Sequence, residues 1–321
     1  MLTLLVLVYE SEKEIPSNLP DFYEKLFSTV FTKHDRLKSG FDRRHYSGLS
    51  ESRIQKLFDA FCFMAMQAGQ GRSLSNEEFL KAFNKACKYV PDSVCELENF
   101  KKDIVKVACL MLEDGYDRTT FLHKSVAEYH AASFIKHSSD PIAIKFYEQA
   151  PESYREWEPV MNFLSFIDSY RYGRDYILKY YPQELEELTK LLQNKSQENL
   201  YNYIERKIPR IRFEVKNHEL YSYARRVTKQ HKMHRDISHT INLIAEEEIN
   251  KSNKEKINKA VKESNIKDEV NSCIGLEAFI NNFNNKKIWQ ALGEIEQETI
   301  NIINKYKEIV NTEDSKHQIF D

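Results

Sequence analysis

Apolar residues recur along this chain mainly at the spacing of a helix. Between positions 54 and 64 they fall at Ile54, Leu57, Phe58, Phe61 and Met64, which one face of an α-helix brings together. Comparable stripes follow at Phe79, Leu80, Phe83 and Cys87, at Trp157, Val160, Leu164 and Ile167, at Tyr176, Ile177 and Tyr180, and at Leu185, Leu188, Leu191 and Leu192. The pattern predicts a protein built mainly of amphipathic helices.

Local start signals indicate three helices before residue 110. The first is expected to begin at Ser50 or Ser52, because serine is a favoured N-cap residue. Ser75 and Glu78 have the Ser-x-x-Glu spacing of a capping box, which predicts the start of the second helix. The third helix is expected over about 95–108.

A β-hairpin is expected directly after these helices. Two short apolar runs, 110–112 and 119–122, flank an acidic segment that contains Asp114 and Gly115. An Asp-Gly pair between two such runs is typical of a hairpin turn. Three helices followed by a hairpin predict a winged helix. The expected fold class is therefore all-α, a helical bundle with a winged-helix domain that carries a small β-hairpin.

From Pro141 to the end of the chain only helices are expected. Pro182 and Pro209 are expected to end or break helices, since proline lacks the main-chain N–H that a helix interior needs. Residues 250–268 are rich in Lys, Glu, Asn and Ser, which indicates a solvated helix or a linker. The last helix is expected to bury an apolar seam with alternating spacings of four and three. That seam comprises Ile288, Leu292, Ile295, Thr299, Ile302, Tyr306 and Ile309.

The composition also indicates in which cellular compartment the protein is expected. The 321 residues are 41% hydrophobic and 30% charged, with only 8 glycines and 8 prolines, which disfavours a turn-rich all-β fold. The five cysteines form no Cys-x-x-Cys pair, so neither a disulfide framework nor a zinc site is expected. The apolar run 1–9 is too short to span a bilayer. We therefore expect a cytoplasmic protein without a membrane partner.

The histidines offer one further metal candidate. His231 and His234 have the i, i+3 spacing that can place two ligands on one face of a helix, and His239 lies close by. A zinc site needs further ligands. No cysteine or well-placed carboxylate joins these histidines in the sequence, so we expect them to lie on a solvated polar face.

Global charge does not point to a polyanionic partner, but one segment is basic. The formal net charge is -2. Residues 205–235 contain ten positive and three negative side chains, with tyrosines interleaved at 201, 203, 221 and 223. Such a cluster can meet a phosphate backbone or dock on an acidic protein surface. The nucleic-acid candidates are Arg206, Arg210, Arg212, Arg225, Arg226 and Lys229.

The predicted winged helix has the wrong charge for reading DNA. Residues 50–121 contain ten Lys and Arg against eleven Asp and Glu. The hairpin turn includes Glu113, Asp114 and Asp117, which would repel phosphates. A DNA-reading winged helix needs a basic recognition helix and wing. We therefore expect this domain to pack against protein, and nucleic acid is not the expected partner.

The most specific feature is the motif at 121–132, Phe-Leu-His-Lys-Ser-Val-Ala-Glu-Tyr-His-Ala-Ala. It resembles the motif that closes the winged-helix part of NACHT-type signalling NTPases of the STAND class. The resemblance implies that a short strand delivers His123 toward the β-phosphate of bound ADP and that a helix follows at once. His123 would then hold the protein in its inactive state. The alternative is a histidine that makes only a structural hydrogen bond at a strand-to-helix junction.

Two earlier segments are similar to the same family. Residues 19–26 resemble a run in the helical domain that follows a NACHT core, and the Leu-rich residues 2–13 resemble the helix at its start. No glycine begins a G-x-x-x-x-G-K-[ST] phosphate loop. The resemblance thus implies the C-terminal, sensing portion without its nucleotide-binding core. Either the gene is split or truncated, with the NTPase half encoded upstream, or translation begins upstream of Met1.

Expectations about chemistry and partners follow from this resemblance. The chain alone is expected to be no enzyme, with no catalytic residue and no metal site. ATP or ADP with Mg would be bound only in a complete NACHT assembly, in contact with His123. The expected partners are the nucleotide-binding half, from an adjacent gene, and an activating ligand that the sequence does not identify. By analogy of architecture with bacterial NACHT proteins, the role would be signal transduction, including antiphage defence.

The expected domains are a remnant of the helical domain at 1–48, a winged helix at 49–138 and a C-terminal helical domain at 139–321. A boundary inside the last domain is expected near 250–268. Two alternatives remain open at this point. One is a stand-alone helical regulator that binds DNA or RNA through residues 205–235, and the other is a degenerate remnant with no activity.

Overall fold

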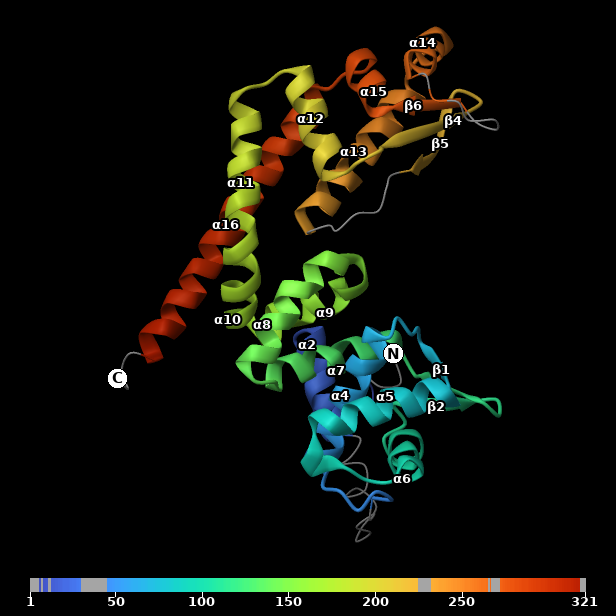
Figure 1. Cartoon of the computed structure of the whole chain (residues 1–321), viewed down its shortest axis with the longest axis vertical. Helices are drawn as coiled ribbons and strands as arrows, with labels where there is room; N and C mark the ends of the chain where they lie inside the picture. The colour runs from blue at the N-terminus through green and yellow to red at the C-terminus, as the bar shows by residue number, and fades with distance from the viewer. Residues whose placement is uncertain are drawn as a thin grey trace. The chain divides into compact units, whose positions relative to one another are not determined.

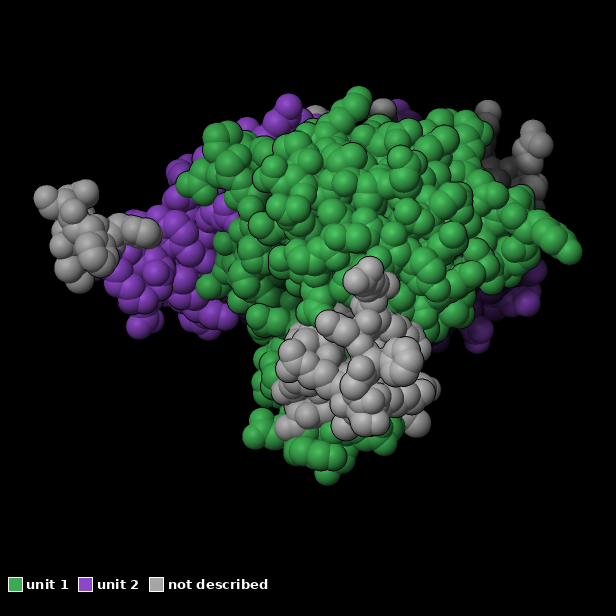
Figure 2. All heavy atoms as spheres, turned by 90° about the horizontal axis from the view of Figure 1, so that it is seen from below, with its two compact units in different colours: residues 1–143, 158–169 green, residues 144–157, 170–321 purple. Residues whose placement is uncertain are grey.

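The computed structural model describes residues 6, 8–10, 13–29, 45–224, 232–264, 266 and 272–317. Helices dominate these residues, and two small antiparallel sheets of three strands each accompany them (Figure 1). This confirms the mainly helical class. The chain divides into two compact units, shown in different colours in Figure 2. Unit 1 comprises 1–143 and 158–169, and unit 2 comprises 144–157 and 170–321.

Unit 1 contains most of the elements that the N-terminal half of the sequence predicts. Helices α8 (Asp140–Gln149) and α9 (Tyr154–Ile167) contribute residues to both units, as does the short α10 (Ser169–Arg171) through Ser169. The short turn η4 (Ala150–Ser153) lies between α8 and α9. The other elements are α2 (Leu19–Ser28), α4 (Glu51–Gln67), β1 (Ser73–Ser75), α5 (Asn76–Tyr89), η2 (Pro91–Ser93), α6 (Leu97–Lys102), the π-helical turn η3 (Asp103–Val107), β2 (Met111–Asp114), β3 (Arg118–Phe121) and α7 (Lys124–His137).

The predicted helix starts are confirmed. Ser50 is the N-cap of α4. At the start of α5, the Glu78 main-chain N–H donates to Ser75 Oγ over 3.3 Å, and the Ser75 N–H donates to Glu78 Oε2 over 2.7 Å. This reciprocal pair is the capping box that the sequence indicated. The Leu-rich start at 2–13 lies largely outside the described residues.

The hairpin is confirmed, and a third strand joins it. Strands β2 and β3 pair antiparallel around Gly115, whose φ of 73° is readily adopted only by glycine. Strand β1 pairs with the other edge of β3, so the sheet order is β1-β3-β2. With three residues, β1 is too short to show a pattern in the sequence, and its pairing depends on a partner about 45 residues away.

Aromatic side chains form the centre of unit 1. Phe61 of α4 contacts Phe79 and Phe100, with ring centroids 4.5 and 5.6 Å apart, and Phe121 of β3 lies 6.3 Å away. Helix α4 is buried over every residue from 57 to 65, and α7 is buried from 125 to 135. A helix that is buried all round occupies the middle of its domain. The remaining elements of unit 1 are therefore arranged around α4 and α7.

Unit 2 differs from the sequence-based expectation in its middle. It contains α10 (Ser169–Arg171), the π-helical turn η5 (Tyr172–Ile177), α11 (Leu178–Gln193), α12 (Gln197–Lys207), β4 (Arg212–Lys216), β5 (Glu219–Ala224), α13 (Lys232–Asn250), α14 (Lys254–Ser264), β6 (Ser272–Gly275), α15 (Leu276–Asn282) and α16 (Lys286–His317). The prediction of helices alone beyond Pro141 is therefore wrong between β4 and β6.

The second sheet has the order β5-β4-β6, with both pairings antiparallel. In β4, Phe213 and Val215 are buried while Arg212 and Lys216 are exposed. This alternation of apolar and charged residues is the ordinary signal of a half-buried strand. The same charges also fit a basic surface, and the sequence alone does not distinguish that surface from a strand.

Two local predictions, one based on a proline and one on heptad spacing, are wrong. Pro182 lies inside α11 instead of ending a helix, because the burial of the neighbouring Tyr181 and Leu188 outweighs its local preference. Pro209 does follow the end of α12 at Lys207. In α16 the buried positions are Ile288, Leu292, Thr299, Ile303, Tyr306 and Val310. The seam shifts away from the expected Ile302 and Ile309, since a straight helix has 3.6 residues per turn and not 3.5.

Residues 254–264 form a helix, which is one of the two predictions for 250–268, a solvated helix or a linker. Most of its polar residues are exposed, but Ile257 and Ala260 are buried in the core of unit 2. This core also includes residues of α11, α12, α13 and α16 and of strands β4 and β6, so the second sheet and the surrounding helices share one apolar interior.

Gly173 allows a close approach inside unit 2. It lies in η5, beside the long helix α16. A Cβ atom at this position would lie 2.8 Å from Cδ1 of Tyr306 and 3.3 Å from Cγ2 of Val310. Both side chains are buried, so they have little room to move. Glycine is therefore required for the packing of η5 on α16.

We expect Gly173→Ala to lower the free energy of unfolding by about 1–3 kcal/mol, the usual effect of overpacking a core. Gly293→Ala in α16 is the matched control, because its Cβ would meet nothing within 4 Å. Alanine is the better helix former, so the control should stabilise the chain by about 0.5–1 kcal/mol. Urea unfolding followed by circular dichroism measures both. Equal stabilisation by the two substitutions would contradict the close packing at Gly173.

Candidate functional site

His123 lies at the junction between β3 and α7. Strand β3 ends at Phe121 and α7 begins at Lys124, which makes His123 the N-cap residue of the helix. Its extended backbone (φ -142°, ψ 145°) lets the ring turn back over the first turn, where Nδ1 accepts from the Ser125 main-chain N–H over 3.3 Å. The Ser125 hydroxyl also bonds Nδ1. His123 itself is exposed to solvent.

A buried tyrosine links this junction to α2. The hydroxyl of Tyr23 is hydrogen-bonded to Ser125 Oγ, so Tyr23, Ser125 and His123 form a continuous chain. The Tyr23 ring stacks on Tyr129 with centroids 5.3 Å apart and meets the edge of Phe163 at 5.9 Å. Burial raises the pKa of Tyr23, which keeps its hydroxyl protonated. The segments 19–26 and 121–132, which the sequence analysis singled out separately, are thus in contact.

The charged neighbours of His123 in the motif pair with each other. Lys124 Nζ lies 3.2 Å from Glu128 Oε1, an i, i+4 ion pair on α7. The Glu128 side chain is largely buried and that of Lys124 is largely exposed. Glu128 thus has a charged partner on its own helix.

A second polar cluster lies beneath the junction, between α4 and α7. His130 Nδ1 donates to Asp59 Oδ1 over 2.6 Å, and Ser133 Oγ donates to Asp59 Oδ2 over 2.6 Å. The imidazole also meets the edge of the Phe58 ring at 4.7 Å. All three polar residues are buried. The cluster is not among the predicted sites, although Asp59, a carboxylate among the buried residues of α4, is a signal for it in the sequence.

This Asp, His and Ser combination does not have the geometry of nucleophilic catalysis. A catalytic serine donates to the imidazole, which a carboxylate orients from the other side. Here the serine hydroxyl and the imidazole both donate to the carboxylate. The cluster therefore fastens α7 to α4 through two satisfied buried donors.

The basic stretch 205–235 does not form one continuous cationic surface in the described residues. The Lys207 ammonium is buried between Glu184 Oε2 at 2.6 Å and Glu187 Oε2 at 2.8 Å. Arg206 also pairs with Glu187, at 2.9 Å. Arg210 and Arg212 are exposed. The candidates Arg225, Arg226 and Lys229 lie outside the described residues.

The expectation of a solvated histidine face is wrong for His234. This residue is buried, and its Nε2 lies 2.9 Å from Glu184 Oε2. The carboxylate comes from α11, 50 residues earlier, which is why the local sequence did not reveal it. Burial alone would raise the pKa of Glu184, but hydrogen bonds and charges from His234 and Lys207 outweigh burial and lower it to about 2. His231 lies outside the described residues.

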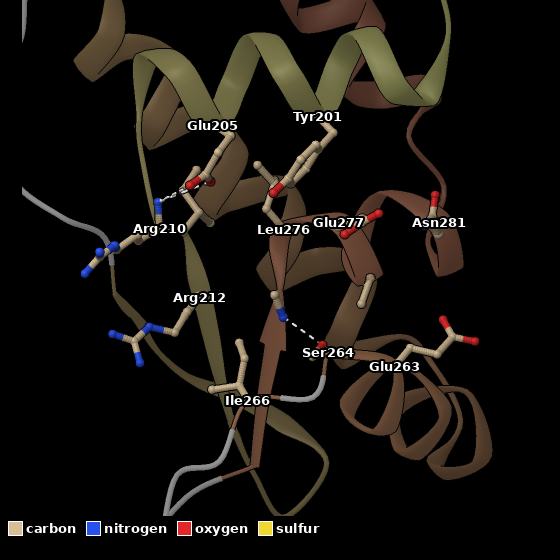
Figure 3. A pocket seen from close by; sticks show the side chains of 13 residues that line it. Tyr201, Glu205, Arg210, Arg212, Glu263, Ser264, Ile266, Leu276, Glu277 and Asn281 are labelled. Atoms are coloured by element: carbon tan, nitrogen blue, oxygen red, sulfur yellow. Dashed lines mark hydrogen bonds between the residues drawn. The ribbon is translucent and has the colours of Figure 1, made fainter.

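Unit 2 also contains a polar cavity of about 700 Å³. Figure 3 shows its lining, which includes Arg210, Arg212, Tyr201, Glu205 and Glu277. Two of the predicted nucleic-acid residues thus border a concave site. In the part of the chain that the structure describes, no group of three or more His, Cys, Asp and Glu side chains is placed to hold a metal ion.

Comparisons of the chain with protein-family models, with curated proteins and with solved structures found no match. Within the described residues, no helix is both long enough and apolar enough to cross a membrane. A functional proposal for this protein therefore depends on its own residues and their geometry.

We expect Asp59→Ala to destabilise the chain strongly. The substitution leaves the buried His130 and Ser133 donors without their acceptor, at a cost of about 2–5 kcal/mol for the two together. Glu77→Gln, which removes only an exposed i, i+4 pair with Lys81, should change stability by less than about 0.5 kcal/mol. Urea unfolding gives both values. An Asp59→Ala effect as small as the control would show that the cluster does not fasten α7 to α4.

A second expectation concerns acid stability. The folded-state pKa of Glu184 is about 2, against an ordinary value of 4.5. Its ionised form therefore stabilises the fold above pH 4.5, and this stabilisation, about 3 kcal/mol in size, is lost as the pH falls toward 2. Glu184→Gln should flatten the decline in stability over this range. Glu186→Gln on the same helix should change the decline much less, because its ion pair with Lys190 is exposed to solvent. Denaturant unfolding at a series of pH values measures it.

Proposed function

We propose that this chain is the regulatory and sensing C-terminal portion of a NACHT-type STAND NTPase. The supporting observation is the place of His123 in its motif. An exposed imidazole stands at a strand-to-helix junction and is oriented by Ser125 and Tyr23. In the family that the motif resembles, a histidine at such a junction meets the β-phosphate of ADP.

The hydrogen bonds at His123 favour the tautomer that this role needs. Nδ1 accepts from the Ser125 N–H, so in the neutral ring the proton resides on Nε2. Nε2 is then a donor, and no residue that the structure describes is bonded to it. A donor on an exposed ring at a fixed angle can bond a phosphate oxygen. The structural bond and the proposed phosphate contact thus use different nitrogens and are compatible.

The proposal includes a winged helix over residues 49–138. Its support is the order of the elements, α4, β1, α5, α6, β2 and β3, together with the sheet order β1-β3-β2. The hairpin exposes Glu113 and Asp114, which suits contact with protein better than contact with DNA. We propose that this domain packs on the nucleotide-binding half of the assembly.

Within this proposal, the chain couples the state of a bound nucleotide to a signal without being an enzyme itself. Phosphoryl transfer needs a phosphate cradle and bound Mg²⁺, which the nucleotide-binding half would supply. ATP or ADP would bind in that half, and His123 would reach it from the winged helix. The complete assembly would respond to an activating ligand and pass the signal to an effector. Antiphage signalling is the role that we propose to test first.

The experiment begins with the DNA upstream of the Met1 codon. A reading frame there that encodes G-x-x-x-x-G-K-[ST] supplies the second half, and the two proteins can be combined and loaded with ADP. Unrelated sequence at that place, with no such protein among those that co-purify with the chain, would overturn the proposal.

Two substitutions separate the phosphate contact from the N-cap. His123→Ala removes both, and His123→Asn keeps an N-cap side chain, because asparagine is among the best N-caps. In the chain alone, Ala should cost about 0.5–2 kcal/mol of stability and Asn much less. In the ADP-loaded pair, both should speed ADP release, roughly ten- to hundredfold for the loss of one charge-assisted bond.

Thermal unfolding of the chain and release of a fluorescent ADP from the pair are the two measurements. If the Asn variant releases ADP at the rate of the unaltered protein, His123 is an N-cap only. His137→Asn is a suitable control, because this histidine lies at the other end of α7, where its Nδ1 is bonded to the Ser133 carbonyl.

A further inference from the structure

The polar cavity of unit 2 has the size and shape of a small-molecule site. It lies among α12, the start of β4, the end of α14, β6 and α15 (Figure 3). Its volume of about 700 Å³ falls within the range of about 300–1,000 Å³ typical of ligand sites in proteins. The whole lining belongs to unit 2.

Two arginines stand along one side of this cavity. In Figure 3 the side chains of Arg210 and Arg212 extend in the same direction from the start of β4. The Arg210 main-chain N–H donates to both carboxylate oxygens of Glu205, over 3.0 and 3.2 Å. This bond fixes the turn, in which Arg210 has a left-handed φ of 60°. No carboxylate of a described residue forms an ion pair with either guanidinium.

The strand beside Arg212 leaves room for a ligand. In the β4–β6 ladder Arg212 is opposite Gly275, which has no side chain. The Gly275 N–H donates to Ser264 Oγ over 2.8 Å, so the end of α14 is held against β6. A Cβ on Gly275 would lie 3.4 Å from Cδ1 of Ile266. A side chain at this position would therefore occupy part of the floor of the cavity, beside Ile266.

The other side offers an aromatic ring and acceptors. Tyr201 projects from α12 above Leu276, and the Glu277 carboxylate lies nearby (Figure 3). Burial and the negative charges of Glu205 and Glu277 raise the pKa of Tyr201, which places both carboxylates in its surroundings. The lining thus has two arginines at one edge, whose guanidinium groups point away from Tyr201 in Figure 3, and an aromatic ring and carboxylates at the other edge.

We propose that this cavity binds a nucleotide. Arg210 and Arg212 would hold the phosphate, because guanidinium groups form paired hydrogen bonds with phosphate oxygens. The base would lie against Tyr201, and its amino or ring N–H groups would donate to Glu277. This site is separate from His123, and the inference is independent of the proposed function.

The charge and size of the cavity select this ligand over others. A bare anion would meet the three carboxylates Glu205, Glu263 and Glu277 as well as the arginines, so a ligand also needs donor groups. A free amino acid has both but fills only a small part of the volume. A nucleic-acid duplex cannot enter a concave site, and the carboxylates would repel its backbone.

Isothermal titration calorimetry on the full chain tests this proposal with AMP, GMP, CMP and UMP and with the four nucleosides. At least one mononucleotide should bind with a Kd below millimolar, and its nucleoside should bind at least about tenfold more weakly, because the phosphate contacts are lost. Arg212→Gln should weaken the mononucleotide by a similar factor. Arg206→Gln is the control, since this exposed arginine pairs with Glu187 outside the cavity.

Gly275→Val fills the floor and should also abolish binding. Arg212 is exposed, so its substitution is expected to leave the unfolding midpoint unchanged, and equal midpoints confirm that the variant is folded. The proposal is overturned if no mononucleotide binds at millimolar concentration or if Arg212→Gln and Arg206→Gln have equal effects. It is also overturned if glycine or glutamate competes as well as the nucleotide, or if only oligonucleotides bind.

Discussion

The packing of α7 on α4 determines where every feature of unit 1 lies. Both helices are buried around most of their circumference, so neither can rotate without opening the core. The Asp59 carboxylate fixes their register, because it accepts from both His130 and Ser133 on α7. With α7 fixed, its first turn is fixed as well, and the His123 ring has a defined direction. The proposed phosphate contact thus depends on a buried cluster that never meets the nucleotide.

In unit 2 a buried charge cluster has the corresponding role. Glu184 of α11 is bonded to Lys207 of α12 and to His234 of α13. Removal of one partner from such a cluster leaves an uncompensated buried charge, which is why these contacts hold three helices in one arrangement. Helix α12 leads directly into Arg210 and β4. The position of the cavity therefore follows from the same contacts. Lys207 belongs to the basic stretch 205–235, but its ammonium group pairs with Glu184 and Glu187 inside unit 2.

Local signals in the sequence were sufficient for part of this fold. Ser75 and Glu78 form their capping box because both partners lie within one turn, and Gly115 marks the hairpin because its left-handed backbone conformation favours glycine. Strands β1 and β6 could not be predicted, since each has three or four residues and pairs with a strand far along the chain. The predictions of a helix end at Pro182 and of a solvated His234 are wrong for the same reason. Their surroundings come from other helices, and a window of neighbouring residues does not contain that information.

By itself, the sequence determined the mainly helical class and the hairpin, because periodicity, caps and turn residues act over a few positions. His123 became a candidate only through the resemblance of its motif to that of a known family. The tertiary structure decided what the polar residues do. It bonds the His123 ring to Ser125, whose hydroxyl is bonded in turn to Tyr23. It buries Lys207 and His234 around Glu184, and it leaves Arg210 and Arg212 at a cavity. A charged side chain has the same appearance in a sequence whether it is buried or solvated, and only the fold determines which partners lie within hydrogen-bonding distance.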